Sequence, residues 1–240
     1  MKHSSIFFVC TTLVMCSLTA PVYAEMGNST VSLGFAHLQL SGLNHFVKDL
    51  SLHNLDTFNN FVNKNYFNSF GEYADASVRG HDGKAKSLQG MSIKYRYEIT
   101  DELGVITSFT WVRSMTNAQA FIDVKPAAQN PAASGRTDIR ANYWSLLAGP
   151  SWRFNEYLSV YAMAGMGVAK VTTDLKINDN LNHGAGSFSE SNSTKKTALA
   201  WAAGAQFNLN ESVAMDVAYE SSGSGDWRTS GVTVGIGLKF

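Results

Sequence analysis

The last nine residues of the sequence, Val232-Thr-Val-Gly-Ile-Gly-Leu-Lys-Phe240, alternate strictly between apolar residues and polar or small ones. In an extended strand the five apolar side chains, from Val232 to Phe240, fall on one face, and Thr, Gly, Gly and Lys fall on the other. One face made wholly of apolar side chains is typical of a strand that faces lipid in a transmembrane β-barrel. This stretch therefore favours an all-β membrane protein.

Seven other segments carry the same period of two. It is clearest in residues 90–98, 199–208 and 212–220, and weaker in residues 30–40, 104–115, 139–154 and 158–172. We expect a bulge or a local break at Pro150, because proline cannot donate a hydrogen bond to a neighbouring strand. With the C-terminal segment these make eight strands. The sequence predicts an eight-stranded antiparallel up-and-down transmembrane β-barrel.

The connections between these segments alternate strictly between short and long. Residues 100–103, 155–157 and 209–211 are short, whereas residues 41–84, 116–138, 174–193 and 221–229 are long and rich in Asn, Ser, Gly and Asp. Outer-membrane barrels have short periplasmic turns and longer extracellular loops. We therefore expect four extracellular loops, with both ends of the mature chain on the periplasmic side.

The N-terminal residues predict export. Lys2 precedes a mainly apolar stretch at residues 6–14, and Val22-Tyr23-Ala24 matches a small-residue cleavage site. We expect residues 1–24 to be a cleaved signal peptide and residues 25–240 to form the outer-membrane barrel. The mean hydropathy of −0.10 and the balance of 19 basic against 19 acidic residues fit a barrel, but a nucleic-acid-binding protein would need a basic surface.

Aromatic residues gather on the faces that we expect to point outward. Such rings settle at the boundary between membrane and water. A soluble β-sandwich would also alternate, but a signal peptide and a terminal aromatic residue favour the barrel. The outward aromatic residues are Tyr95, Tyr97, Phe109, Trp111, Trp144, Trp152, Trp201, Phe207, Tyr219 and Phe240.

Several runs of sequence resemble the Ail/Lom family of outer-membrane proteins, which includes OmpX and PagC. The runs are Lys94-Tyr-Arg-Tyr-Glu98, Gly104-Val-Ile-Thr-Ser-Phe-Thr110, Ala148-Gly-Pro-Ser-Trp-Arg-Phe-Asn155 and Ser230-Gly-Val-Thr-Val-Gly-Ile-Gly-Leu-Lys-Phe240. The resemblance covers about residues 86–240 well and implies an eight-stranded barrel in the outer membrane of a Gram-negative cell. It also implies links to adhesion, host-cell entry or resistance to complement. The first two long loops look longer than those of the family, so the binding functions transfer less well than the fold.

Charged and polar residues fall on the expected inward faces of the strands. An eight-stranded barrel is just wide enough to be filled by side chains, and buried charges need partners. We therefore expect a network that fills the interior, and the alternative is a path for protons or ions. Its members are Lys94, Arg96, Glu98, Arg153, Gln206, Asp216, Glu220 and Lys239.

The sequence gives no sign of catalysis, a metal site or a cofactor. A lipid-modifying barrel enzyme would need a histidine and a serine close together on an outward strand. None of the six histidines has a His-x-Ser spacing, and only His37 falls in an expected strand. We expect no catalytic residue, no metal and no cofactor, and we keep a lipid-modifying enzyme as the least favoured alternative.

The first long loop is unusually rich in aromatic residues. These side chains could present a contact surface to a host-surface or matrix protein, or they could form a cap over the barrel mouth. The candidate contact residues are Phe46, Phe58, Phe61, Tyr66, Phe67, Phe70 and Tyr73. Two functions remain open: a surface interaction protein that serves adhesion, host contact or serum resistance, and a structural envelope barrel with shielding loops.

The remaining partners expected from the sequence belong to the membrane. The barrel would contact outer-membrane lipid and lipopolysaccharide throughout its life. During assembly it would meet the barrel-insertion machinery, for which Phe240 resembles the C-terminal signal. We expect no nucleic acid among its partners.

Overall fold

The computed structural model describes residues 29–43, 45, 77–81, 87–123, 133–179 and 188–240. The expected signal peptide at residues 1–24 lies outside this part of the chain. The described residues form β1 (Ser29–Leu40), β2 (Ser77–His81), β3 (Leu88–Glu98), β4 (Leu103–Asp123), β5 (Ala133–Arg153), β6 (Leu158–Asp179), β7 (Phe188–Asn208), β8 (Val213–Ser222), η2 (Gly225–Trp227) and β9 (Thr229–Lys239). The architecture is all-β.

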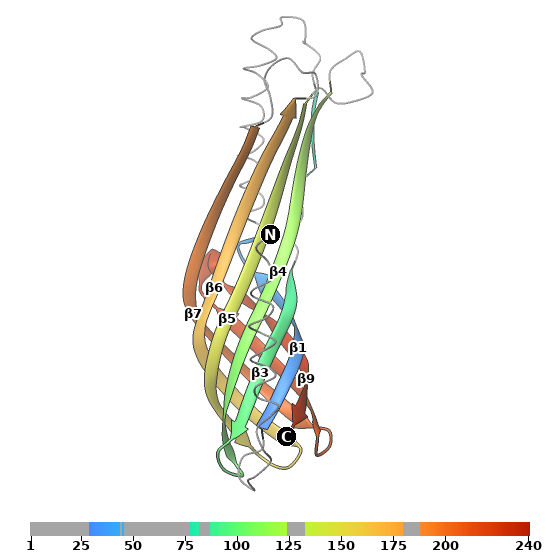
Figure 1. The fold of residues 1–240 in the computed structure, drawn as a ribbon. Helices are drawn as coiled ribbons and strands as arrows, with labels where there is room; N and C mark the ends of the chain where they lie inside the picture. The colour runs from blue at the N-terminus through green and yellow to red at the C-terminus, as the bar shows by residue number, and fades with distance from the viewer. Residues whose placement is uncertain (1–28, 44, 46–76, 82–86, 124–132, 180–187) are drawn as a thin grey trace, which may run out of the picture.

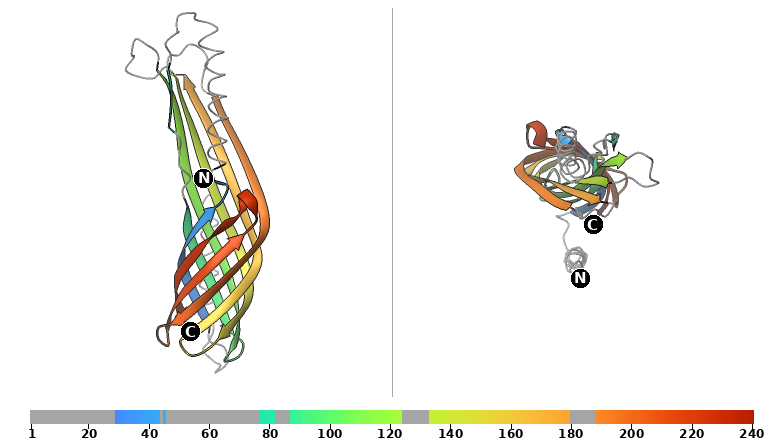
Figure 2. Two further views of the ribbon diagram at one scale, coloured as in Figure 1. Left: turned by 180° about the vertical axis from the view of Figure 1, so that it is seen from behind. Right: turned by 90° about the horizontal axis from the view of Figure 1, so that it is seen from above.

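Eight of these strands close into a barrel. Every strand except β2 pairs antiparallel with its neighbours along the chain, and β1 pairs with β9 to complete the ring. Seen from above, the strands form a closed ring (Figure 2). At the lower end the Ser29 and Phe240 backbones exchange two hydrogen bonds of 2.8 and 2.9 Å. The prediction of an eight-stranded antiparallel barrel is confirmed, and both described ends lie on the side of the short turns (Figure 1).

The three short turns share one construction. A polar side chain at the start of each turn accepts backbone hydrogen bonds from residues that follow it: Thr100 from Leu103, Asn155 from Tyr157 and Leu158, and Asn210 from Ser212 and Val213. Asn and Thr side chains commonly stabilise turns by bonding to the backbone two or three residues on. The sequences Thr100-Asp-Glu-Leu103, Asn155-Glu-Tyr-Leu158 and Asn210-Glu-Ser-Val213 therefore act as repeated stop signals between strands.

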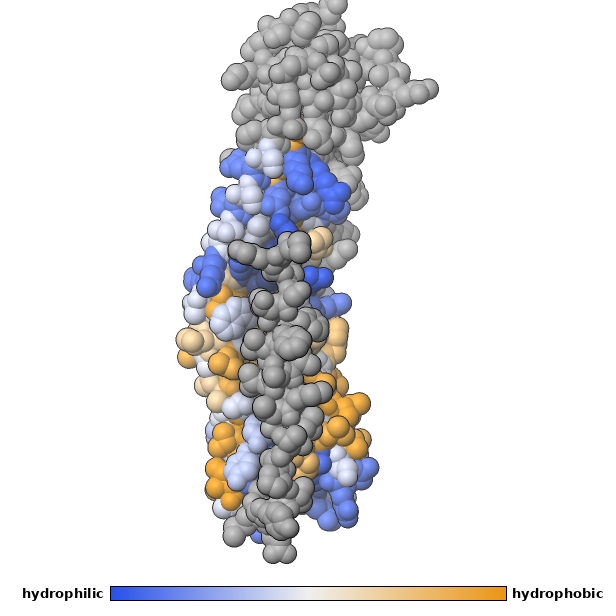
Figure 3. All heavy atoms as spheres, in the orientation of Figure 1, coloured by the Kyte–Doolittle hydropathy of each residue, from blue (hydrophilic) through white to orange (hydrophobic). Residues whose placement is uncertain are grey.

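The outer surface of the lower half is apolar. All ten aromatic residues expected on outward faces are exposed, among them Trp152 at 49% and Phe240 at 51%. Figure 3 shows hydrophobic residues, in orange, gathered on this lower half, below a hydrophilic upper region. This apolar band matches the part of a barrel that contacts lipid. Among the described residues, no helix is both long and apolar enough to cross a membrane.

Pro150 interrupts the pairing between β5 and β6. The register pairs Ala148 with Ala164 and then Ser151 with Tyr161, which leaves Gly149 and Pro150 without partners on that side. Both residues keep their partners on β4. Because the register is the same before and after the gap, the proline causes a local break and not a bulge. The sequence predicted a bulge or a local break at Pro150, and the structure has the local break.

Four strands are much longer than the sequence suggested. The strands β4, β5 and β7 have 21 residues each and β6 has 22, whereas β1, β3, β8 and β9 have 10 to 12. About 9–11 residues suffice to cross a membrane. The long strands therefore continue as an open sheet above the barrel (Figure 1). The expected loops 116–138 and 174–193 were wrong in extent, because strand structure leaves only residues 124–132 and 180–187 between them.

The expected loop 41–84 also contains regular structure. Residues 77–81 form β2, which pairs with the outer end of β4 from Gln119 to Asp123. At the other end of this segment, the Ser41 and Gly42 amides donate to the carbonyls of Arg228 and Asp226, each at 2.8 Å. The chain thus leaves the barrel rim beside the β8–β9 connection, and at β2 it rejoins the sheet along the outer end of β4.

Deleting Phe240 should lower the amount of barrel assembled in the outer membrane. Phe240 lies where the last strand meets the first and closes the barrel. Its ring is exposed, and its backbone forms two hydrogen bonds with Ser29. The measurement is the heat-modifiable fraction of outer-membrane protein, since a closed barrel migrates differently before and after boiling. Phe240→Tyr, which keeps an aromatic ring, should assemble normally. Normal assembly of the deletion variant, with signal cleavage unchanged, would show that Phe240 is not the assembly signal.

Candidate functional site: the barrel interior and the sheet above it

The interior of the barrel holds a buried ion pair at its centre. The Lys94 ammonium, on β3, forms a salt bridge with the Asp216 carboxylate on β8. The same ammonium donates to the hydroxyls of Thr233, at 2.9 Å, and Tyr161, at 3.1 Å. Both charged side chains are at least 95% buried. A charge this deep is tolerated because partners surround it on every side.

Tyr161 connects the two charges of this pair. Its hydroxyl accepts from Lys94 and donates to the Asp216 carboxylate at 2.8 Å. The ring lies over Gly204, the register partner of Tyr161 on β7, where a Cβ would lie 2.5 Å from the Tyr161 hydroxyl. A larger residue at position 204 would therefore displace Tyr161. Gly167 makes room for Tyr143 in the same way.

A second group of charges lies nearer the periplasmic end. Glu98 accepts from Arg96 at 3.2 Å and also pairs with Arg153. Arg96 additionally donates to the Gln206 side-chain oxygen, at a longer 3.4 Å. One carboxylate therefore serves two guanidinium groups.

Glu220 is surrounded by hydroxyl groups. Its carboxylate accepts from Tyr143 at 2.8 Å, Ser145 at 2.5 Å and Thr110 at 2.9 Å. Sequence reasoning placed Glu220 inside but missed these three partners. Their positions in the sequence could have indicated this role. Each of the three residues occupies an inward-facing position of its strand, where its hydroxyl can bond only to another group inside the barrel.

Of the eight expected interior residues, Lys239 stands apart. It lies at the end of β9, is partly exposed, and makes none of the ion pairs found among the described residues. Above the charges lies a buried apolar cluster that includes Leu38, Leu88 and Ile139. The interior is thus occupied by paired charges and packed side chains, an arrangement that stabilises the barrel.

The open sheet above the barrel has two different faces. On β5 and β6 its inward side chains are buried and mostly apolar, such as Ile139, Val171 and Ile177. Its outward side chains are charged: a salt bridge joins Arg136 to Asp138 along β5, and another joins Arg140 on β5 to Asp174 on β6. The Ser191 hydroxyl on β7 donates to Asp174 at 2.7 Å, and with Arg140 it lowers the pKa of Asp174 from its usual value. The outer face is therefore an ordered, hydrated surface.

The seven aromatic residues proposed as loop contacts, from Phe46 to Tyr73, lie outside the described residues. The structure does describe where their segment is attached, at the rim through Gly42 and on the tall sheet through β2. Leu43, just before the segment, is buried in the upper apolar cluster. The aromatic segment is thus tied to the extracellular end of the protein at both of its ends.

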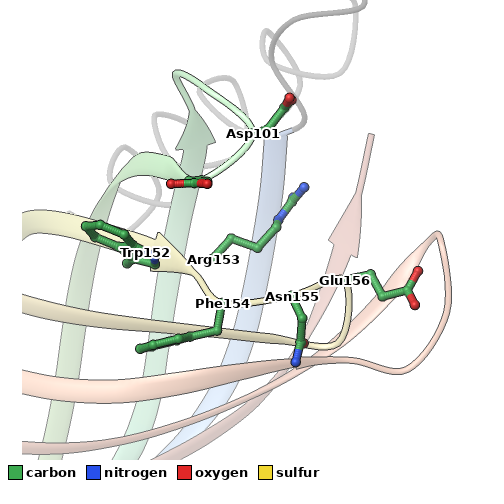
Figure 4. Close-up of a pocket in the computed structure, with 7 residues that line it drawn as sticks. Asp101, Trp152, Arg153, Phe154, Asn155 and Glu156 are labelled. Carbon is green, nitrogen blue, oxygen red and sulfur yellow. The ribbon is translucent and has the colours of Figure 1, made fainter.

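A cleft of about 370 Å³ opens at the periplasmic end, between the β3–β4 and β5–β6 turns. Acidic side chains from Asp101 and Glu156 line it beside Arg153 and Trp152. Figure 4 shows these side chains diverging instead of converging on one point. Within the described ranges, no three His, Cys, Asp or Glu side chains are grouped so that they could hold a metal ion. The cleft therefore lacks the convergent groups of a binding site.

Comparisons with known proteins agree with this architecture. The family model described as Enterobacterial Ail/Lom protein matches residues 69–240. The chain is 34% identical to outer membrane protein lom of Escherichia phage lambda, over 68% of this chain and 79% of that protein. It is 32% identical to virulence membrane protein PagC of Salmonella typhimurium, over 70% and 83%.

A solved structure gives the same fold. The chain resembles the crystal structure of Ail, the attachment invasion locus protein of Yersinia pestis, in complex with the heparin analogue sucrose octasulfate. The TM-score is 0.54 with 26% sequence identity, and the match covers 90% of this chain and all of that one. The similarity thus extends over most of the chain and agrees with the eight-stranded barrel.

Proposed function

The chain belongs to the Ail/Lom family of Gram-negative outer-membrane β-barrels, which are non-enzymatic, and from that premise we propose that it is a surface interaction protein. In this proposal it contacts host or cell-surface molecules through the part that stands above the membrane. Adhesion, host-cell contact and serum resistance are the roles that such contacts would serve. A purely structural envelope barrel is the competing function.

The observation that carries the proposal is the height of the sheet. The strand β6 has 22 residues, and its outward side chains change from apolar to charged at Lys170, about halfway along. The upper halves of the four long strands therefore do not contribute to crossing the membrane. An ordered sheet that rises about ten residues above the lipid suits the presentation of loops to molecules outside the cell.

The attachment of the aromatic segment supports the same role. Residues 46–76 connect the rim to β2, which is paired with the outer end of β4. Aromatic side chains bury a large area with few torsions to freeze, and they dominate many protein interfaces. Because β2 joins the end of this segment to the outer end of β4, its aromatic side chains would be available for contact with another surface.

The names of relatives point in the same direction. One relative is described as a virulence membrane protein, and the solved structure is that of an attachment invasion locus protein. Those descriptions belong to these relatives. For this chain they favour adhesion over a shielding role.

Replacing Phe58, Phe61 and Phe67 with serine should abolish adhesion to cells or extracellular matrix. The change removes apolar contact area from the segment without altering its charge. The measurement is the number of bound bacteria at matched surface abundance, with heat-modifiable migration as the check that the barrel is intact. The matched control replaces the same three residues with tyrosine and should keep most of the adhesion.

Salt gives a second readout for the same strains. Contact through aromatic side chains should persist at ionic strengths that screen a charge-driven interaction. If the serine variant adheres as well as the parent protein, the aromatic segment is not part of the binding surface. Unchanged adhesion combined with a less stable barrel would instead identify the segment as a cap.

A further inference from the structure

The charges at the periplasmic end of the interior are not balanced. Arg96 and Arg153 share the single carboxylate of Glu98. Lys239 lies at the same end of the barrel and makes no ion pair with any described residue. Three cationic side chains therefore accompany one carboxylate, whereas the ion pair at the centre of the barrel matches one cation with one carboxylate.

Hydrogen-bond donors without an acceptor gather around the same charges. Within the described part of the chain, the Nε–H groups of Arg96 and Arg153 are buried and have no hydrogen-bond partner. The same holds for the hydroxyl groups of Thr30, Ser151 and Ser159, and each of these three residues is at most 1% exposed. A buried polar group without a partner costs free energy, so a cluster of five such groups calls for an acceptor.

The strand register places the three hydroxyl groups on both sides of the guanidinium groups. Thr30 on β1 is directly opposite Arg96 on β3, and Ser159 on β6 is directly opposite Arg153 on β5. Directly opposite residues point to the same face, with Cβ atoms about 5 Å apart. Ser151 precedes Arg153 by two residues and therefore faces the interior as well. The donors thus form one group that extends from β1 to β6.

A glycine brings the Ser151 hydroxyl toward the charges. Gly104 on β4 stands between Ser151 and Glu98 in the register. A Cβ at position 104 would lie only 2.8 Å from the Ser151 hydroxyl oxygen. The hydroxyl therefore lies over Gly104, on the side of β5 that faces the strand carrying Glu98 and Arg96.

This group of donors is open to the periplasm on one side. The Arg153 side chain is 21% exposed and lines the cleft of about 370 Å³ between the short turns (Figure 4). Asp101 and Glu156 line the same cleft, but they are exposed to water, which screens their charges. A small ion can therefore reach the buried donors from the periplasm.

We propose that this end of the interior binds a small inorganic anion, of the class of chloride or phosphate. The anion accepts hydrogen bonds from the arginine Nε–H groups and the neighbouring hydroxyls, and its charge offsets the cationic excess that Glu98 leaves. Arginine suits this role because it keeps its charge when buried and donates several hydrogen bonds in a fixed plane. The site is independent of the adhesion proposal, because it lies at the opposite end of the protein from the tall sheet.

The test follows the unfolding temperature of the whole protein in a zwitterionic detergent by tryptophan fluorescence. Sodium gluconate, whose anion is too large for a buried site, is replaced stepwise by sodium chloride or sodium phosphate at constant ionic strength. The variant is Thr30→Val together with Ser159→Ala, which removes two hydroxyls and leaves every charge in place. The matched control is Thr229→Val, because Thr229 also has a buried hydroxyl without a partner in the described structure, at the other end of β9.

Chloride or phosphate should raise the unfolding temperature of the parent protein and of the Thr229→Val control until the site is saturated. The double variant should bind the anion about tenfold more weakly, because a hydrogen bond to a charged group is stronger than one between neutral groups. In gluconate the double variant should be at least as stable as the parent, because apolar groups replace buried hydroxyls that lack partners.

Crystals soaked in bromide or in arsenate, which stand in for chloride and phosphate, give a direct second measurement. One of the two ions should produce an anomalous scattering peak beside Arg96 and Arg153. A peak and a thermal response with chloride and bromide would identify a halide site, and the same pair of results with phosphate and arsenate would identify an oxyanion site. Either outcome supports the proposal.

Three results would overturn it. Equal unfolding temperatures in gluconate, chloride and phosphate would show that the parent protein binds no small anion. If the double variant keeps the full thermal response, the anion binds elsewhere on the protein. If neither bromide nor arsenate gives a peak beside the two arginines, their Nε–H groups and the three hydroxyls are hydrated instead.

Discussion

Replacing Asp216 with leucine should lower the free energy of unfolding by about 3–5 kcal/mol. The change leaves the Lys94 ammonium buried without its carboxylate, with only hydroxyl groups from Thr233 and Tyr161 beside it. It also takes the hydrogen-bond acceptor from Tyr161. The measurement is a urea titration of protein folded in lipid vesicles, followed by heat-modifiable migration or tryptophan fluorescence.

Two controls separate the buried pair from charge in general. Combining Asp216→Leu with Lys94→Met should recover most of the lost stability, because removing both partners leaves no unpaired charge. Replacing Asp138 with leucine breaks an exposed pair, in which the Arg136 side chain is 53% exposed, and should cost at most about 1 kcal/mol. Equal losses in Asp216→Leu and Asp138→Leu would contradict the paired-charge interior.

The barrel itself could be predicted from the sequence because lipid imposes one simple pattern. Contact with lipid requires an outward apolar face with a period of two, which the residues from Val232 to Phe240 show in full. The same rule placed the strand starts near the short turns to within one residue, at Leu103 and Leu158 for example. The short turns were equally visible, because their polar residues interrupt the alternation.

The upper sheet was missed because the pattern there is inverted. Above the membrane the outward face meets water, so the apolar residues occupy the inward steps instead. On β6 the inward series is Val171, Thr173, Leu175 and Ile177, and the outward series includes Asp174 and Lys176. The period of two continues through both halves of the strand. If only apolar outward residues are taken as the sign of a strand, the upper half of each long strand is mistaken for a polar loop.

The upper part of β7 could not be found by pattern at all. From residue 189 to residue 197 every described side chain is exposed, because β8 reaches only as far as the pairing of Ser222 with Ala200. Neither face of this edge is buried, so no alternation arises. Similarly, inward residues such as Glu220 could be identified, but their partners depend on the register of strands far apart in sequence.

Shortening the sheet should abolish adhesion and leave the barrel intact. The register places Asn117, Asp138, Asp174 and Ser191 in one row across β4 to β7. Cutting at this row and joining Asn117 to Asp138, and Asp174 to Ser191, by two-residue Asn-Gly turns removes residues 118–137 and 175–190. Such turns suit directly opposite residues of a hairpin. The lipid-facing band and the buried ion pairs remain.

This variant also removes the outer end of β4 on which β2 is paired. The aromatic segment would remain in the chain but would lose one of its two attachments. Loss of adhesion is therefore expected even though every residue from 46 to 76 is present. A control that deletes only residues 125–131, between the ends of β4 and β5, keeps this attachment and should retain adhesion.

The most direct test of the central claim counts bacteria bound to host cells when the full-length protein and the shortened-sheet variant are present at equal surface abundance. Both proteins must show heat-modifiable migration, so that each is known to be a closed barrel. We expect the shortened variant to bind no better than a strain without the protein, while the full-length protein confers adhesion. Equal binding by the two proteins would contradict the claim that the sheet above the membrane presents the interaction surface.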